Sequence, residues 1–183
     1  KNEFHASLSR IFSYAAWADK YDGAVHDAPY RGVTMALPEA IGVLAQIAPE
    51  ENPLITTISL IAPAIAMGNR VVLIASERYA SIALELVQTL ETSDIPAGVV
   101  NILTGNKADL AEQLAGHAEV DGIWCWAEPE IVSQVETTSA TDLKRLWVHI
   151  DGDRDWLDSR QGEGLEFLRN ATEVKNIWTP YGD

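Results

Sequence analysis

Residues 41–77 read IGVLAQIAPEENPLITTISLIAPAIAMGNRVVLIASE, and this stretch predicts a strand, a helix and a second strand in close succession. The apolar run 41–48 has the length of a buried strand. Asn52 is of a residue type that commonly caps a helix N-terminus. Pro53 suits the first helical position, which does not need the N–H that proline lacks. Four apolar residues of this helix recur at helical spacing: Leu54, Ile58, Ile61 and Ile65. The run 71–74 is a second buried strand, and a strand–helix–strand unit of this length makes its two strands parallel.

The same alternation of strands and helices continues to residue 150. We expect further helices over 76–92, 109–116 and 130–138, and further strands over 99–103, 122–126 and 145–150. About five parallel strands with helices on both faces make a doubly wound, Rossmann-like α/β sheet.

Two N-terminal segments lie outside this alternation. Residues 3–20 predict an amphipathic helix, whose apolar face comprises Phe4, Leu8, Ile11, Ala15 and Ala18. The segment 32–37 is a short strand, and the dipeptide Pro38-Glu39 is expected to turn it toward the strand at 42–48. We therefore expect residues 32–48 to form a small antiparallel arm that projects from the main sheet.

The composition excludes several classes of protein. The chain has 13 basic and 27 acidic residues, and its net charge of -14 repels a phosphate backbone. The sequence has neither an apolar run long enough to span a bilayer nor a basic-then-apolar leader. The single cysteine excludes an internal disulfide framework and fits a reducing compartment. We therefore expect a cytoplasmic protein that binds neither nucleic acid nor membranes, and, since it begins with lysine, one that is part of a longer polypeptide.

Several of these segments resemble the aldehyde dehydrogenase family in order and spacing. GVLAQIAPEENPL (42–54) and APAIAMGNRVVLIASE (62–77) are similar to that family's GVxGQIxPWNFPL and APALAxGNxVVxKPxE patterns. YAAWADK (14–20) is similar to the family's YxxGWADK helix. The resemblance runs from about Arg10 to about Gly152, and it implies a dinucleotide-binding-type domain.

The end of the chain resembles the family's C-terminal strand. After Gly152 a polar stretch leads to a short helix around Leu165 and then to EFLRNATEVKNIW (166–178), which is similar to the family's YTxVKTV pattern. In the family a catalytic domain of roughly 200 residues, a length typical of one domain, separates these two points. The resemblance therefore implies that residues 1–152 are a degenerate dinucleotide-binding-type domain and 153–183 a linker, a short helix and an oligomerisation-type strand, with the catalytic domain excised.

The family's catalytic positions are replaced in this chain. The asparagine of PWNFP that hydrogen-bonds an oxyanion matches Glu51, and a carboxylate has no proton to donate. The general-base glutamate of ELGG matches His149, which is better interpreted as a partly buried imidazole at a strand end. Cys125 lies between two tryptophans, where a small buried hydrophobe is expected rather than a nucleophile. We therefore predict no catalytic residue, with Glu51 and His149 at the positions of two lost ones.

The cofactor-binding positions are also altered. The lysine of VVxKPxE that reaches the adenosine ribose matches Ile74, whereas the glutamate of that motif is kept as Glu77. The phosphate-binding turn GSTxxG matches residues 127–132, AEPEIV, where both glycines are lost and Pro129 removes an N–H donor. Glu77 is the one remaining candidate for cofactor binding, and it could equally serve as a first-turn helix acid. We predict that this chain binds no cofactor and no metal, and that the parent enzyme uses NAD or NADP.

Two hypotheses follow from these observations. The first is a non-catalytic structural and assembly domain, similar to the truncated second region of family-16 aldehyde dehydrogenases. Its partner would be a complete catalytic unit, in the same polypeptide or in another subunit, and a homo-oligomer would be a further assembly. Residues 172–178 would then pair with 32–37 or with 41–45. The second hypothesis is a residual NAD(P)-binding half-site that contributes to aldehyde oxidation by a partner unit.

Overall fold

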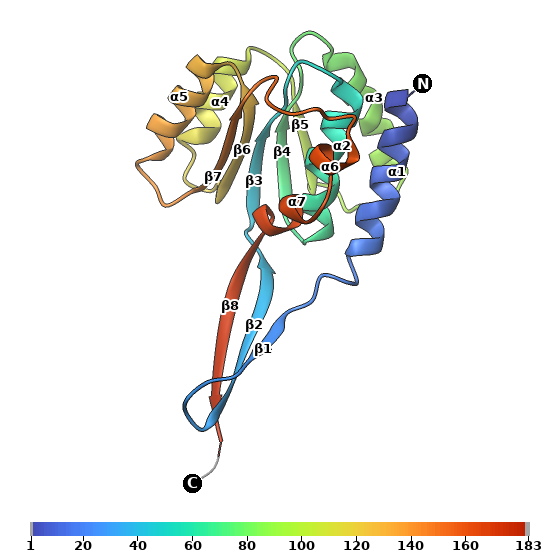
Figure 1. Ribbon diagram of the computed structural model, residues 1–183. Helices are drawn as coiled ribbons and strands as arrows, with labels where there is room; N and C mark the ends of the chain where they lie inside the picture. Colours follow the sequence, from blue (N-terminus) through green and yellow to red (C-terminus); the bar gives the residue numbers. More distant parts are fainter. Residues whose placement is uncertain (1, 182–183) are drawn as a thin grey trace.

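The computed structural model describes residues 2–181 and consists of a layered α/β body from which a three-stranded arm extends (Figure 1). The body contains a five-stranded parallel sheet in the order β5-β4-β3-β6-β7. The strands are β3 (Val43–Ile47), β4 (Arg70–Ile74), β5 (Val100–Leu103), β6 (Gly122–Ala127) and β7 (Arg145–Ile150). From the central β3 the chain steps outward to β4 and β5, then crosses to β6 and β7, which is the doubly wound topology. The predicted fold class is confirmed.

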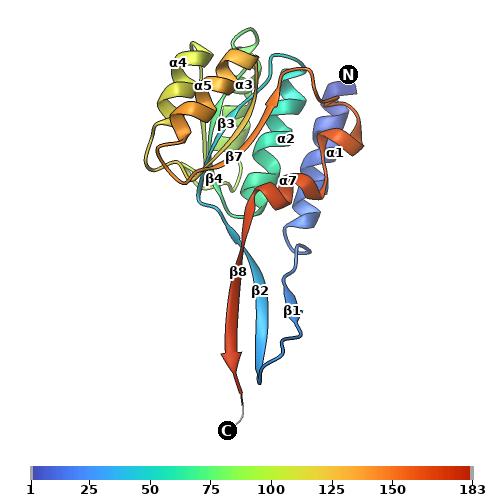
Figure 2. The ribbon, with the colours of Figure 1, turned by 60° about the vertical axis from the view of Figure 1, so that its left-hand side comes forward.

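Helices cover both faces of this sheet. They are α2 (Pro53–Ala66), α3 (Ala80–Glu91), α4 (Lys107–Ala115) and α5 (Pro129–Ser139). Figure 2 shows α2 on one side of the sheet and α4 and α5 on the other. Successive strand residues point to opposite faces, so Leu44 and Val71 share one core with α2, whereas Ala45 and Ile74 share the other with α4 and α5. Among the described residues no helix is long and apolar enough to cross a membrane.

The beginning of α2 differs from the sequence prediction. Pro53 is the first helical residue, as predicted, but Asn52 has a left-handed backbone (φ 48°, ψ 57°) and its side chain makes no capping hydrogen bond. Side-chain capping requires an extended backbone at that position. The donors are satisfied instead by Glu3, whose Oε1 accepts hydrogen bonds from the N–H groups of Leu54 (2.8 Å) and Ile55 (3.2 Å). A carboxylate is also favoured there by the positive end of the helix dipole.

The helix that carries Glu3, α1 (Asn2–Trp17), buries a different face from the one predicted. Phe4 is 55% exposed, and Leu8 and Ile11 of the predicted apolar face are exposed as well. The buried side chains are those of Ser7, Arg10 and Tyr14. Arg10 donates hydrogen bonds to Ser59 Oγ on α2 and to the carbonyl of Trp156, and Tyr14 Oη accepts one from the N–H of Gly164 at 3.1 Å. Polar contacts to distant segments, rather than apolar periodicity, therefore orient α1.

The arm is an antiparallel sheet of β1 (Ala24–His26), β2 (Gly32–Ala40) and β8 (Thr172–Pro180), with β2 in the middle. The predicted pairing of 172–178 with 32–37 is confirmed, with Met35 opposite Ile177, whereas the alternative at 41–45 is wrong.

The expected arm over 32–48 is too long, because β3 belongs to the body sheet and β2 does not turn at Pro38-Glu39. Pro38 is tolerated inside β2 because β1 pairs only as far as Ala36, which leaves one edge of β2 open beyond that point. The bend between arm and body falls at Gly42, whose φ of 131° suits glycine.

The segment between β7 and β8 returns across the α2 side of the body. It contains α6 (Ser159–Gly162), which the sequence did not predict, and α7 (Leu165–Asn170), which it did. Trp156 and Phe167 from this segment are buried in the same core as Trp124 and Trp126 of β6. Residues 151–171 therefore complete the core of the body before the chain enters the arm.

Candidate functional site

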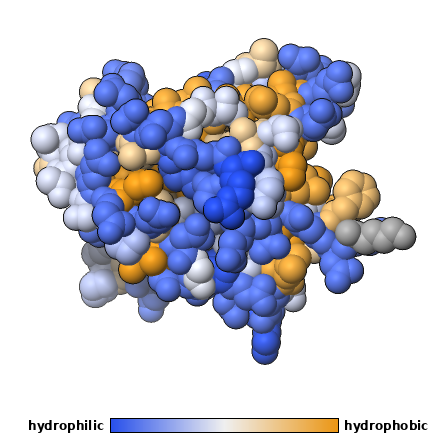
Figure 3. Space-filling model, turned by 90° about the horizontal axis from the view of Figure 1, so that it is seen from above, coloured by the Kyte–Doolittle hydropathy of each residue, from blue (hydrophilic) through white to orange (hydrophobic). Residues whose placement is uncertain are grey.

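A cavity of about 500 Å³ lies at the carboxyl edge of the body sheet. It is lined by Glu50, Glu77, Arg78, Asn106, Lys107, Ala108, Glu128, Ile131 and Asp151. These residues follow β3, β4, β5, β6 and β7, and the cavity lies where the strand order reverses beside β3. Ligands of doubly wound sheets bind at this position. Figure 3 views the molecule from this end, where hydrophilic side chains cover most of the surface.

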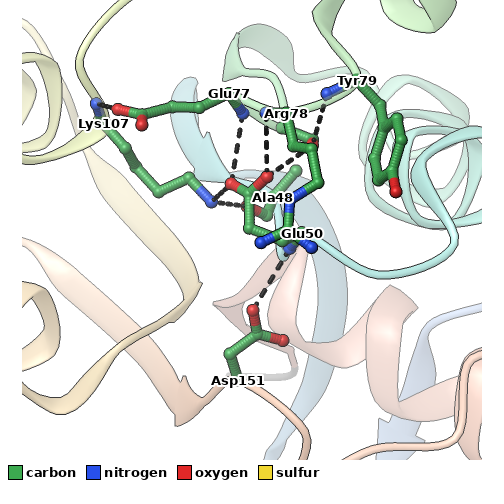
Figure 4. Close-up of polar contacts among 8 residues, drawn as sticks. Ala48, Glu50, Glu77, Arg78, Tyr79, Lys107 and Asp151 are labelled. Atoms are coloured by element: carbon green, nitrogen blue, oxygen red, sulfur yellow. Dashed lines mark hydrogen bonds and ion pairs between the residues drawn. The ribbon is translucent and has the colours of Figure 1, made fainter.

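The Glu50 carboxylate is held by four donors (Figure 4). Oε2 accepts hydrogen bonds from Ser76 Oγ at 2.6 Å and from the N–H of Arg78 at 3.1 Å. Oε1 accepts from the N–H of Glu77 at 3.1 Å and forms an ion pair with Lys107 Nζ. Burial alone would raise the pKa of Glu50, but hydrogen bonds from Lys107, Ser76 and Arg78 outweigh it and lower the pKa to about 2. Glu50 is therefore ionised near neutral pH.

Lys107 connects this carboxylate to the start of α4. The residue is only 5% exposed, and Nζ also donates to the carbonyl of Ala48 at 2.8 Å. Its backbone N–H donates to Glu77 Oε1, and Asn106 Oδ1 accepts from the N–H of Asp109 at 2.9 Å, so both acceptors cap α4. Because of this cap, α4 begins at Lys107 rather than at Asp109 as predicted. Glu77 is thus engaged as a helix-capping acid inside the cavity.

The helix predicted over 76–92 does not begin at Ser76. Ser76 Oγ accepts a hydrogen bond from the N–H of Tyr79 at 3.1 Å, which closes a turn after β4. The helix itself begins only at Ala80. The turn exposes two successive N–H groups, those of Glu77 and Arg78, to the Glu50 carboxylate.

The remaining residues singled out by the sequence lie apart from one another. Glu51 is exposed and is not part of the cavity lining. His149 is half-buried on β7 and stacks on Trp126 with ring centroids 5.3 Å apart. Its Nε2 is buried without a hydrogen-bond partner, and burial together with the nearby Arg154 guanidinium lowers the pKa of His149. Cys125 is fully buried, as expected, and burial raises the pKa of its thiol to about 12, so it is not a thiolate near neutral pH.

Two positions that match cofactor-binding residues of the family pattern, Ile74 and Pro129, differ in their surroundings. Ile74 is fully buried in the core beneath α4 and α5. At the start of α5 Glu128 occupies the cap position without a side-chain capping bond, and Pro129 is the first helical residue. Glu128 lines the cavity, so a carboxylate stands at the helix N-terminus that would otherwise attract an anion.

Charge and ligand chemistry limit what this cavity can do. Four carboxylates, those of Glu50, Glu77, Glu128 and Asp151, line it together with two cationic side chains. The ammonium of Lys107 is already paired with Glu50. Within residues 2–181 no group of three or more His, Cys, Asp or Glu side chains is arranged to hold a metal ion.

Sequence reasoning missed Glu50 and Lys107 as members of this site. Lys107 carried one usable signal, since a residue in the turn after a parallel strand lies at the carboxyl edge of the sheet. No local pattern identified its partner, because the two residues are 57 positions apart.

Comparison with known proteins identifies the family. A model of the aldehyde dehydrogenase family matches residues 1–157. An aldehyde dehydrogenase of Agaricus bisporus is 32% identical over 147 residues, which cover 80% of this chain and 29% of that protein. The NADP/NAD-dependent aldehyde dehydrogenase PuuC of Escherichia coli K12 is 30% identical over 153 residues, 83% of this chain and 31% of its own length. The crystal structure of PnpE from Pseudomonas sp. WBC-3 superimposes with a TM-score of 0.78 at 27% identity, covering 81% of this chain and 30% of that one.

The chain spans about 30% of the length of these relatives. The region shared with them includes the parallel sheet and the cavity at its carboxyl edge. The chain therefore belongs to the aldehyde dehydrogenase family.

Proposed function

We propose that this chain is a non-catalytic structural and assembly domain of an aldehyde dehydrogenase polypeptide. The observation that carries the proposal is the connection between β7 and β8. Residues 151–171 contain α6 and α7, and Trp156 and Phe167 from this span pack into the body's own core. A catalytic domain inserted here would have to displace that packing. The boundary at residue 152, with a linker and strand over 153–183, is part of the proposal.

The state of the residues at the carboxyl edge supports the same proposal. Glu51 is exposed, His149 packs against Trp126, and the Cys125 thiol is buried and neutral. His149 Nε2 has no hydrogen-bond partner, so it is not paired with the buried Cys125 thiol as a nucleophile–base pair for acyl chemistry would require. Glu50 and Glu128 place negative charge where a pyrophosphate would lie.

The arm supports the assembly part of the proposal. The outer edge of β8 has no neighbouring strand in residues 2–181, and unpaired edges are usually covered by a partner. Val25, Val174 and Trp178 are exposed on the arm, and Trp178 is 71% exposed. We propose that the partner is a catalytic aldehyde dehydrogenase unit in the same polypeptide or in another subunit, or a second copy of this chain, in the cytoplasm. The parent enzyme would use NAD or NADP.

A second candidate function is a residual NAD(P)-binding half-site that assists a partner's aldehyde oxidation. It is favoured by the cavity at the topological switch point and by Glu77 in its lining. It is opposed by Ile74, by Pro129 and by the capping bond that already engages Glu77.

Isothermal titration of the chain with NAD+ and with NADP+ separates the two functions. We expect dissociation constants weaker than about 1 mM, which corresponds to less than about 4 kcal/mol of affinity. The NADP/NAD-dependent aldehyde dehydrogenase PuuC serves as the positive control under the same buffer conditions. A micromolar constant for the chain would refute the non-binding proposal and favour the half-site.

A further inference from the structure

The donors around Glu50 come from elements other than its own. Glu50 follows β3, whereas Ser76, Glu77 and Arg78 form the turn after β4 and Lys107 begins α4. In Figure 4 these donors converge on one carboxylate, whereas Asp151 accepts a hydrogen bond from the backbone N–H of Glu50 at 3.2 Å. We call the hydroxyl of Ser76, the N–H groups of Glu77 and Arg78 and the ammonium of Lys107 the anion nest.

The physical chemistry of the anion nest is that of an anion-binding site. Successive backbone N–H groups that point into one concavity attract negative charge, and a hydroxyl donor adds to them. The ammonium of Lys107 is almost fully buried, and a buried cation needs a counter-charge within contact distance. The nest does hold an anion, since both oxygens of the Glu50 carboxylate accept hydrogen bonds from it.

The nest also opens toward solvent through the cavity. Glu50, Glu77, Arg78 and Lys107 all line the space of about 500 Å³ at the carboxyl edge. An anion that replaced the carboxylate could therefore enter from solvent and remain partly hydrated when bound. Arg78, whose backbone already belongs to the nest, is placed to add a second cation.

We infer that Glu50 is a tethered anion that keeps a phosphate-sized anion site closed, and that this site accepts a free phosphate group when the carboxylate is removed. The inference rests on the proposed absence of nucleotide binding, and it supplies a physical cause for it. An intramolecular carboxylate competes at a high effective concentration, so a free phosphate at millimolar levels does not displace it. Glu50 stays ionised at all physiological pH values, since its pKa is lowered to about 2.

Titration with inorganic phosphate at constant ionic strength tests this inference. Glu50→Ala empties the nest, and Glu50→Gln removes its charge while keeping the side-chain shape. The matched control is Glu128→Ala, which removes one carboxylate from the same cavity lining and leaves the nest filled. We expect phosphate to bind Glu50→Ala at least tenfold more tightly than wild type or Glu128→Ala. The double variant Glu50→Ala/Lys107→Met should lose this gain.

Equal phosphate affinity of Glu50→Ala and Glu128→Ala would overturn the inference, because the effect would then be one of net charge alone. A Glu50 variant that folds poorly is still decisive, since a ligand of the native state shifts the folding equilibrium. Phosphate should then raise the folded fraction of Glu50→Ala or Glu50→Gln more than that of Glu128→Ala. If phosphate does not raise it, the inference of an anion site is contradicted. Nucleotide titration of the wild-type chain tests the proposed function separately, so the two failures are distinguishable.

Discussion

Phe167 on α7 should contribute to the stability of the whole body. Its side chain is fully buried, and its ring centroid lies 5.1 Å from that of Trp147, 6.2 Å from those of Trp124 and Trp156, and 6.4 Å from that of Tyr14. Replacing a buried phenylalanine by alanine costs about 3–5 kcal/mol, and aromatic pairs add about 0.5–1.5 kcal/mol beyond buried area. We therefore expect Phe167→Ala to lower the free energy of unfolding by about 4 kcal/mol. This is a large part of the 5–15 kcal/mol typical of a domain.

The assay is urea unfolding followed by tryptophan fluorescence and by far-ultraviolet circular dichroism. With a slope of about 2 kcal/mol per molar urea, the loss moves the midpoint down by about 2 M. Leu165→Ala is the matched control, since Leu165 lies on the same helix and is 39% exposed, and it should cost less than about 1 kcal/mol. A loss below about 1 kcal/mol for Phe167→Ala, or separate transitions by the two probes, would show that α7 is an independent linker. In that case the packing of the β7–β8 connection would not oppose an inserted catalytic domain.

Four further predictions concern single features. Glu3→Ala should lower the free energy of unfolding by about 1 kcal/mol, because the cap of α2 is lost, and an unchanged urea midpoint would contradict the capping role. The depressed pKa of Glu50 means that its stabilisation is present above about pH 4.5 and is lost as the pH falls toward about 2. The difference in unfolding free energy between wild type and Glu50→Gln should therefore be constant from pH 5 to 7 and shrink below pH 4.5, and a difference that persists at low pH would refute this assignment. Removing residues 172–183 from the parent protein should weaken its assembly, measured by size-exclusion chromatography with light scattering, and an unchanged mass would remove the assembly role. The chain should show no dehydrogenase or esterase turnover, and turnover that disappears in Cys125→Ser would overturn the core assignment of that thiol.

Local sequence patterns predicted the body sheet well. The strands at 71–74 and 122–126 and the start of α2 at Pro53 match the structure closely. Both strands lie inside the sheet, and a strand buried on both faces is apolar whatever its neighbours are. Proline at a first helical position is equally a local signal. The doubly wound topology follows from these elements, because parallel strands need crossover helices of one hand.

Features that depend on distant contacts were predicted wrongly or were missed. The exposed face of α1 contains the apolar residues that periodicity assigned to the core, because Arg10 and Tyr14 bind segments that follow about 150 residues later. Glu3 rather than Asn52 caps α2 for the same kind of reason, because the acceptor Glu3 lies 51 positions before the donor Leu54 in the chain. A local sequence pattern contains no information about contacts with residues that are distant in the chain.

The features of the candidate site can likewise be separated into those predicted from the sequence and those that depend on distant contacts. The sequence by itself determined the family resemblance, the parallel sheet and the replacement of the lysine and glycine positions at Ile74 and 127–132, because each depends on residue type at a fixed spacing. Only the tertiary structure decided that Glu50 rather than Glu51 faces the cavity, that Lys107 neutralises it, and that Glu77 is used as a helix cap. These groups meet because the carboxyl ends of parallel strands converge at one edge of the sheet, which brings together charges that lie far apart along the chain.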